Sequence, residues 1–309
     1  MGSKVRLLGV EVKISVIVPS LEGGMPRGLR DDPRLEIIAV KGMSPVGKAR
    51  NEGLRRATGE YVAWVDSDDE ITEDWVDEIC SAIGEGVDVI TIDAKCVGWK
   101  DRGDVIWGVR QEEATIERLR RDVYRDVVRP SMLWLYVIKR ELWRDLWLDE
   151  SVRVAEDYLL LPKVLARAKS CKYIDKLIYR YVCNEKSLIN TQDFARFCEV
   201  MPLWERRLNE APESAKCECR WGVAVSFYWL CDRVAIVPSM SEQSGAKECA
   251  KKCREKIRSI YWGLWREFFK ARDFPLSHRI EWMMKFTCAA LDFWWVQRRR
   301  YRSRRGVAT

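Results

Sequence analysis

Apolar and polar residues follow two periods along the first 190 positions, one typical of strands and one typical of helices. Short apolar runs rich in β-branched and aromatic residues predict buried strands at 13–19, 35–40, 60–65, 87–92 and 173–182. Amphipathic segments between these runs predict helices at 46–57, 72–83, 115–128 and 153–168. The alternation predicts an α/β domain with a mostly parallel sheet over residues 10–190. Beyond residue 190 the pattern is helical, which predicts a helical C-terminal extension over residues 191–309.

Three carboxylates follow the apolar run 61–65 within four positions: Asp66, Asp68 and Asp69. They fall at the C-terminal end of a predicted strand, where open α/β sheets place their ligands. In extended backbone Asp66 and Asp68 share one face. Two carboxylates on one face favour a hard divalent cation, Mg²⁺ or Mn²⁺, that bridges to a phosphorylated substrate. The alternative interpretation is an acidic turn that caps the next helix.

The segments on either side add candidate binding residues. Residues 20–28 carry three glycines and a proline, which predicts a loop beside a ligand. Ser44 and Pro45 predict the start of a helix, with the serine at the N-cap and the proline at the first helical position. Arg50 then lies near the helix start, where its guanidinium and the helix dipole can face a phosphate group. An ordinary surface arginine is the alternative.

Composition indicates a globular protein. The chain has 309 residues, of which 47% are hydrophobic and 33% charged. It shows neither the pattern of a signal peptide nor 18 consecutive apolar residues, so we expect a cytoplasmic location. The 11 cysteines are then expected to be mostly free thiols. The pairs Cys217/Cys219 and Cys249/Cys253 offer four zinc thiolates, but their spacings are unusual and the second pair also fits one helix face.

The order of the motifs resembles that of a known enzyme family. SVIVP at residues 15–19, ARNEGL at 49–54, ATGEYVAWVDSDDEI at 57–71, AEDYLLLPKVL at 155–165 and IYRYVCNEKSLI at 178–189 occur in sequence. Together they resemble the family 2 inverting glycosyltransferases of GT-A fold. The resemblance covers about residues 13–190. It implies a Rossmann-like nucleotide-diphospho-sugar transferase domain that uses Mn²⁺ or Mg²⁺.

The resemblance also implies roles for individual residues. Asp66 and Asp68 match the DxD-type motif, with Asp68 as the direct metal ligand and Asp66 a metal ligand or a contact of the ribose or donor sugar. Asp157 matches the general base that deprotonates the acceptor hydroxyl. The remaining matched positions would bind the nucleotide sugar: Pro19 and Ser20 at the base, Lys41 after the second strand, Arg50 near the nucleotide, and Arg180 and Tyr181 over the donor diphosphate.

Two departures from the family pattern concern the nucleotide and the metal. Where the family usually carries an Asp-Asp-Gly-Ser-like motif that reads uracil, this chain has Lys41-Gly42-Met43-Ser44. The helix and strand that usually follow are missing, so UDP is expected by family habit alone. Some members use a histidine as a metal ligand near residues 180–187. The only histidine here is His278, far from that segment.

The expected function is metal-dependent, inverting transfer of a sugar from a nucleotide-sugar donor to an acceptor hydroxyl. The acceptor would be a glycan, a lipid-linked saccharide or a protein. Charge stabilisation at the leaving diphosphate and one carboxylate base suit this chemistry. The competing hypothesis is a non-catalytic glycosyltransferase-like fold that serves as a membrane or protein adaptor.

The C-terminal extension carries the basic character of the chain. Residues 191–309 contain 23 Lys and Arg against 14 Asp and Glu, a net charge of +9. Eight tryptophans in this region occur at helical positions and are expected in the core: Trp204, Trp221, Trp229, Trp262, Trp265, Trp282, Trp294 and Trp295. The wide apolar face of residues 278–296 leads into the arginine cluster at 298–305. This segment predicts either peripheral binding to an anionic membrane surface or a docked terminal helix with a basic tail, whereas nucleic-acid binding has weak support.

Overall fold

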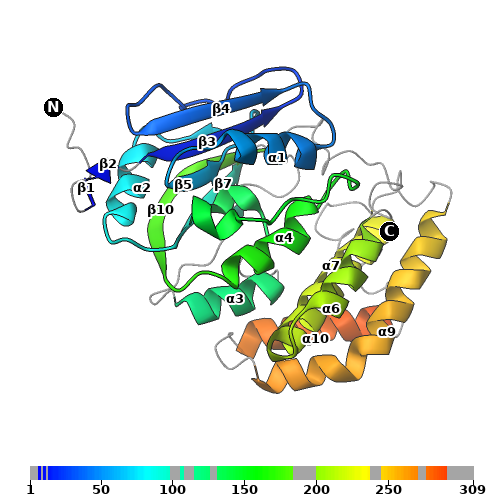
Figure 1. Cartoon of the computed structure of the whole chain (residues 1–309). Coiled ribbons are helices and arrows are strands. Elements are labelled where there is room, and N and C mark those ends of the chain that lie inside the picture. Colours follow the sequence, from blue (N-terminus) through cyan, green and yellow to red (C-terminus); the bar gives the residue numbers. More distant parts are fainter. Residues whose placement is uncertain are drawn as a thin grey trace. The chain divides into compact units, whose positions relative to one another are not determined.

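The computed structural model describes residues 6–7, 10–11, 13–97, 105–107, 115–125, 131–183, 200–236, 245–270 and 276–290 (Figure 1). The chain divides into two compact units. The first contains Met1–Val123 and Val128–Thr191, and the second contains Tyr124–Val127 and Gln192–Thr309. The first unit is an α/β structure and the second is helical.

A mixed sheet forms the centre of the first unit. Within the described residues its strand order is β4-β3-β5-β9-β7-β10-β6, with β8 paired to β7. The strands are β3 (Ile14–Ser20), β4 (Leu35–Lys41), β5 (Tyr61–Trp64), β6 (Glu70–Ile71), β7 (Val89–Val97), β8 (Val105–Trp107), β9 (Tyr136–Lys139) and β10 (Cys171–Val182). A separate hairpin joins β1 (Arg6–Leu7) and β2 (Val10–Glu11).

The strands that carry the predicted site run parallel. β3 pairs in parallel with both β4 and β5, and β10 pairs in parallel with β7. β9 is antiparallel to β5 and β7, while β6 and β8 are antiparallel additions. Every residue of β3 and β5 is buried, as expected for central strands covered on both faces.

Short helices connect the strands (Figure 1): α1 (Val46–Arg56), α2 (Trp75–Ile83), α3 (Ile116–Arg125), η1 (Leu133–Leu135), η2 (Arg140–Trp143) and α4 (Glu156–Leu165). The predicted N-cap of α1 is wrong. Pro45 follows a cis peptide bond and itself occupies the N-cap position, without a side-chain cap. Gly53 of α1 lies so close to β3 that an added Cβ would stand 2.2 Å from Cγ2 of Ile17. The helix therefore packs directly on the strand.

Glu36 of β4 connects the turn before β5 to the sheet through hydrogen bonds. Its carboxylate accepts hydrogen bonds from the Ser15 hydroxyl at 2.5 Å and from the backbone N–H and hydroxyl of Thr58 at 2.8 and 2.7 Å. Partial burial opposes ionisation, but these hydrogen bonds outweigh it and lower the pKa of Glu36 to about 2. The ionised carboxylate thus stabilises the end of the α1–β5 connection.

Replacing Glu36 by glutamine is expected to lower the free energy of unfolding at pH 7 by about 1 kcal/mol, because neutral amide hydrogen bonds are weaker and partly solvated. The folded-state pKa lies below the unfolded value of 4.5, so the stabilisation is present above that pH. It is lost as the pH falls towards 2. Urea unfolding across this pH range measures the difference. Glu60→Gln, at an exposed position nearby, is the control and should show no such dependence.

The second unit is a bundle of helices: α6 (Met201–Glu210), η3 (Glu213–Ala215), α7 (Lys216–Ile236), α9 (Ala246–Lys270) and α10 (Leu276–Ala290). Trp204, Trp221 and Trp282 are buried and make edge-to-face or tilted ring contacts with Phe227 or Phe286, which confirms them as core residues. The prediction was wrong for Trp262, which is 82% exposed, and for Trp229, which is 39% exposed. Trp294 and Trp295 lie outside the described residues.

The cysteines of the described region are free thiols, as expected from the sequence. Cys249 and Cys253 lie on one face of α9 beside Met201, with sulfur–sulfur distances of 3.2 and 3.7 Å. Among the described residues, no group of three or more His, Cys, Asp or Glu side chains is arranged to hold a metal ion. None of the described helices is both long and apolar enough to cross a bilayer.

Candidate active site

The carboxyl ends of β3, β4 and β5 form the edge where the predicted ligand residues meet. β4 lies on one side of β3 and β5 on the other, so the chain reverses its winding direction at β3. Ligands of open α/β sheets bind at such a reversal, beyond the carboxyl ends of the strands. Pro19 and Ser20 end β3 and pair with Val40 and Lys41 at the end of β4, while Asp66 lies two residues after the end of β5.

The carboxylates after β5 lie in a turn rather than in extended backbone. The N–H of Asp69 donates to the carbonyl of Asp66 at 3.1 Å, which closes a four-residue turn. The expectation that Asp66 and Asp68 share a strand face was therefore wrong, because β5 ends at Trp64. Asp68 is exposed at the turn, and Asp66 is half-buried.

Asp69 is a site residue to which the sequence assigned no role. Its carboxylate points toward the protein interior. Its carboxylate accepts hydrogen bonds from the Tyr179 hydroxyl at 2.6 Å and from the Val182 N–H at 2.9 Å. The Tyr179 oxygen also accepts the N–H of Asp66 at 3.3 Å. Burial, and then the negative charge of Asp66, raise the pKa of Asp69 to about 8. This network joins the acidic turn to the end of β10.

Arg50 joins the acidic turn to the start of α4. One guanidinium nitrogen donates to Oδ1 of Asp66 at 2.9 Å, and the other donates to Oε1 of Glu156. Only 6% of Arg50 is exposed. Burial alone would lower the pKa of Arg50, but the charges of Asp66, Glu156 and Asp157 outweigh it and raise the pKa. The sequence placed this guanidinium at a phosphate, whereas the structure places it between protein carboxylates.

The neighbouring residues of α1 position the segment that leads to α4. Asn51 donates to the carbonyl of Leu148 at 3.0 Å and to Glu150 at 2.8 Å, and it accepts the Leu148 N–H at 2.9 Å. A Cβ at Gly47 would approach the Asp149 carbonyl and Glu156 Cγ at 3.2 and 3.3 Å. One face of α1 therefore holds the 148–156 segment, since positions three and four apart share a helix face.

Glu156 and Asp157, the acidic pair at the start of α4, have different environments. Glu156 is buried and paired with Arg50. Asp157 is half-buried, and its charge acts on Arg50. Because Arg50 also contacts Asp66, the predicted base and the predicted metal motif belong to one electrostatic cluster.

Lys41 lies over the glycine loop at the end of β4. Its Cδ, Cε and Nζ come within 2.9 Å of the position that a Cβ would take at Gly23. The Gly23 N–H donates to Oγ of Ser20 at 2.8 Å, which folds the loop back over the end of β3. The Lys41 side chain is exposed, so a cation is available at this edge.

Arg180 and Tyr181, predicted to close over the donor, point to opposite faces of β10. Arg180 is exposed, and its guanidinium lies 3.7 Å from Glu70. Tyr181 is buried against Trp134, with ring centroids 5.8 Å apart, and Tyr179 stacks on the same tryptophan at 4.8 Å. Residues 184–187, which follow in the same motif, lie outside the described residues.

The donor atoms of the acidic turn suit a hard divalent cation. Carboxylate oxygens are the preferred ligands of Mg²⁺ and Mn²⁺. Asp68 is an exposed residue of the turn. Arg50 engages Oδ1 of Asp66, whereas Oδ2 has no hydrogen-bond partner among the described residues. Two protein carboxylates suit Mg²⁺ in particular, because it usually keeps several waters or substrate oxygens as ligands.

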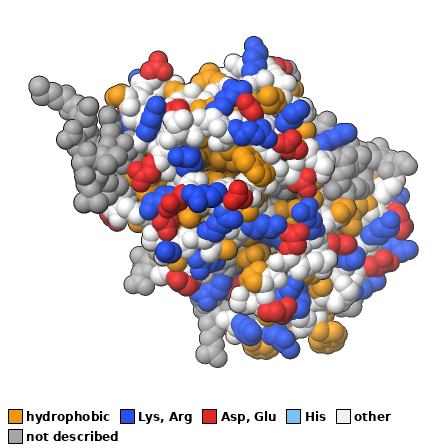
Figure 2. Space-filling view, viewed as in Figure 1, with side chains coloured by type: hydrophobic (Ala, Val, Ile, Leu, Met, Phe, Trp, Pro, Cys, Tyr) orange, Lys and Arg blue, Asp and Glu red, His pale blue; other side chains and the backbone are white. Residues whose placement is uncertain are grey.

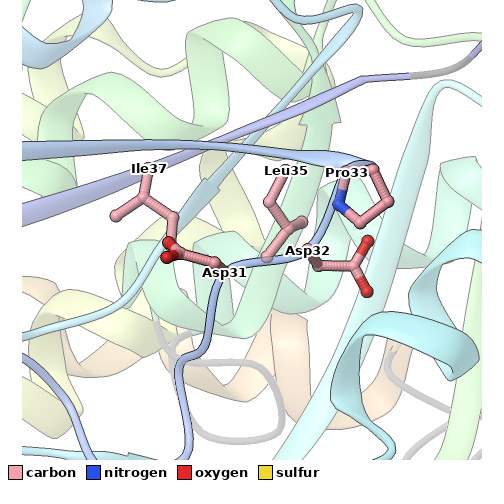
Figure 3. A pocket seen from close by; sticks show the side chains of 5 residues that line it. All are labelled: Asp31, Asp32, Pro33, Leu35 and Ile37. Atoms are coloured by element: carbon pink, nitrogen blue, oxygen red, sulfur yellow. The ribbon is translucent and has the colours of Figure 1, made fainter.

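The cavities in the structure lie apart from the predicted site residues. One of about 430 Å³ is lined by Asp31, Asp32, Pro33, Leu35 and Ile37, beside the start of β4 (Figure 3). Another of about 470 Å³ is lined by Leu54, Arg140, Glu141, Trp143, Arg144, Asp145 and Trp147. Neither of these two cavities includes a residue of the acidic turn.

Comparison with known proteins finds similarity between part of the first unit and glycosyltransferases. Residues 27–133 match the family model described as Glycosyl transferase family 2. This segment contains Lys41, Arg50 and the acidic turn, and it ends before α4. The chain is 26% identical over 202 residues to the succinoglycan biosynthesis protein ExoO of Rhizobium meliloti, a match that covers 58% of this chain and 55% of ExoO.

A second relative is the poly(ribitol-phosphate) beta-N-acetylglucosaminyltransferase TarS of Staphylococcus aureus. It is 27% identical over 164 residues, covering 51% of this chain and 27% of TarS. The chain thus spans little more than half of one curated relative and about a quarter of the other. The crystal structure of S. aureus TarS 1-349 in complex with UDP-GlcNAc superposes with a TM-score of 0.61 at 18% identity, covering 91% of both chains. The same fragment without that ligand gives a TM-score of 0.58 at 19% identity, with 91% of both chains covered.

Proposed function

We propose that the chain contains a family 2 glycosyltransferase domain of GT-A fold and that it transfers a sugar from a nucleotide-sugar donor to an acceptor hydroxyl. The observation that carries this proposal is the Arg50 bridge. It links Asp66 of the acidic turn to Glu156, the residue before Asp157. A donor-side motif and a candidate base are thereby held in one cluster, as a displacement reaction requires.

The donor is proposed to be a UDP-sugar that binds at the carboxyl ends of β3, β4 and β5. The likeness to TarS, whose structure contains UDP-GlcNAc, supports this choice of nucleotide. Pro19 and Ser20 would lie at the base, and Asp66 at the ribose or sugar. Lys41 and Arg180 are exposed cations at this edge of the sheet that can approach the anionic donor.

The reaction is proposed to invert the anomeric carbon in a single displacement. Asp157 would accept the proton of the acceptor hydroxyl as that oxygen attacks the anomeric carbon, and the nucleoside diphosphate leaves from the opposite side. When bound, a divalent cation at Asp68 and Asp66 would stabilise the charge on the leaving diphosphate. The single positive charge of Arg50 is shared between Asp66 and Glu156, and Asp157 is the carboxylate that we propose as the base.

The acceptor is proposed to be a glycan, since the names of the relatives describe the synthesis or glycosylation of polymers. A lipid-linked saccharide or a protein is the other acceptor class consistent with hydroxyl chemistry. We also propose a cytoplasmic location for the enzyme. Peripheral attachment to a membrane would involve its helical unit.

Donor binding is tested by a thermal-shift panel of UDP, GDP, CMP and dTDP sugars, each with and without Mn²⁺. We expect UDP-sugars to raise the melting temperature in the presence of Mn²⁺. Asp68→Ala should abolish the metal-dependent part of that shift, because it removes the exposed carboxylate of the turn. Asp31→Ala, at an exposed carboxylate beside the cavity of Figure 3, is the matched control and should retain the full shift.

Two outcomes would contradict the proposal. No shift with any donor at millimolar concentration would favour the non-catalytic adaptor. A metal-dependent shift that persists in Asp68→Ala would place the metal elsewhere.

A further inference from the structure

The last three turns of α9 expose a face that combines aromatic and basic residues. Its exposed positions are Arg258, Ser259, Trp262, Arg266, Phe269 and Lys270, here called the basic-aromatic face. At 100° per residue these positions fall on one side of the helix. The buried residues Ile257 and Leu264 lie on the opposite side. Trp262 is 82% exposed and Phe269 is 66% exposed, so neither ring contributes to the core of the helical unit.

Within the last three turns of α9 the charge of this face has one sign, and the exposed Glu255 lies on the same side of the helix one turn earlier. Three of its six residues are basic and none is acidic. The acidic residue within the same turns, Glu267, is buried and accepts hydrogen bonds from Arg125 at 3.0 and 2.9 Å. Arg266 and Lys270 have no ion-pair partner among the described residues, so their charges are available to a partner outside the chain.

The helical unit also exposes several large hydrophobic side chains outside its core. Within the described residues, ten large hydrophobic side chains are exposed, and five of them lie on α9 and α10. Those of α10 are four residues apart: Leu276, Ile280 and Met284. α10 is held to α9 by a hydrogen bond of 2.7 Å between Tyr261 and Thr287. In Figure 2, hydrophobic and basic side chains are interspersed on the visible surface of the molecule.

We propose that the basic-aromatic face docks the protein on a bilayer that contains anionic phospholipid. Tryptophan and phenylalanine partition to the headgroup region of a bilayer, and arginine and lysine are attracted to anionic lipid. A protein partner is the alternative occupant that the test addresses, because tryptophan, phenylalanine and arginine are also enriched at protein interfaces, whereas lysine is depleted there. The enzyme would thus be held at a membrane surface by a helix that does not cross it.

The test is co-sedimentation of the full-length protein with vesicles of phosphatidylcholine alone and with about 30% phosphatidylglycerol. We expect at least tenfold stronger partitioning onto the anionic vesicles. The double variant Trp262→Ala/Phe269→Ala should lower that partitioning about tenfold or more, because both rings leave the interface. Arg266→Gln/Lys270→Gln should lower it by about fivefold for each charge removed, and only on anionic vesicles.

Matched controls separate this face from the rest of the chain. Trp147→Ala removes a half-exposed tryptophan of the first unit and should leave partitioning unchanged. A variant with glutamine at the six arginines of residues 298–305 tests the C-terminal tail. Because the α9 positions are exposed, all α9 variants should keep the wild-type melting temperature and donor binding.

The proposal is overturned by any of three results. Failure of the wild type to bind vesicles, or equal binding to neutral and anionic vesicles, would exclude docking through anionic lipid. Binding that the tail variant abolishes while Trp262→Ala/Phe269→Ala retains it would assign the contact to the tail. Tighter binding of single-stranded RNA than of vesicles, lost in the same α9 variants, would make the face a nucleic-acid site.

Discussion

Asp157→Asn is expected to slow sugar transfer by about 10²- to 10⁴-fold while leaving donor binding unchanged. The range is the usual contribution of a positioned general base. Asparagine keeps the shape of the side chain but cannot accept the proton of the attacking hydroxyl. The Arg50 bridge should persist, because it is made to Glu156 and Asp66 rather than to Asp157. Initial rates with saturating donor, together with the Mn²⁺-dependent thermal shift, measure the two effects separately.

The control for this experiment is Asp77→Asn. Asp77 is an exposed carboxylate of α2 that pairs with Arg34 at the surface, so its loss should not alter the rate. If Asp157→Asn retained more than about a tenth of the wild-type rate, another group would have to serve as the base. Loss of donor binding in this variant would instead indicate that Asp157 supports the donor site.

Arg50→Met is expected to lower the free energy of unfolding by about 3–5 kcal/mol, the usual cost of removing one partner from a buried ion pair. The variant leaves Asp66 and Glu156 without their shared cation, and Glu156 is only 3% exposed. Lysine should restore little of the loss, because an ammonium on a flexible stem does not reproduce the two-armed geometry of a guanidinium. Chemical denaturation of the metal-free protein gives the change in unfolding free energy.

Arg55→Met provides the matched control on the same helix. Arg55 is half-exposed and its ion pairs lie at the surface, so its loss should cost no more than about 1 kcal/mol. Adding Glu156→Gln to Arg50→Met should recover part of the stability, because it removes a buried charge that has lost its partner. Equal stability of the wild type and Arg50→Met would show that the bridge contributes nothing, and the positioning role would be withdrawn.

Local sequence predicted the elements that carry the site with useful accuracy. The β-branched runs around Val16 and Ile38 became β3 and β4, because such residues pack well in strands buried on both faces. The run that ends in Asp66 became β5 followed by carboxylates at the sheet edge. These predictions succeeded because strand identity depends on residues close together in the chain.

Predictions that depended on distant contacts were less successful. Arg50 looked like a phosphate ligand because it follows a helix start, but its partners Asp66 and Glu156 come from two other elements. Asp69 and Tyr179 were missed because they meet across 110 positions of sequence. The motif ARNEGL contains both Arg50 and Asn51. It does not show that Asn51 binds the 148–150 segment, because that contact depends on the tertiary structure.

The α/β pattern, the helical extension and the acidic turn at a strand end could all be predicted from the sequence. They follow from local periodicity and residue chemistry. The partners and the exposure of the carboxylates, in contrast, depend on the tertiary structure. It directed Asp69 inward to Tyr179, paired Asp66 and Glu156 with one arginine, and left Asp68 exposed. It also left Trp262 outside the core. Burial and charge pairing depend on which segments meet, and packing decides that.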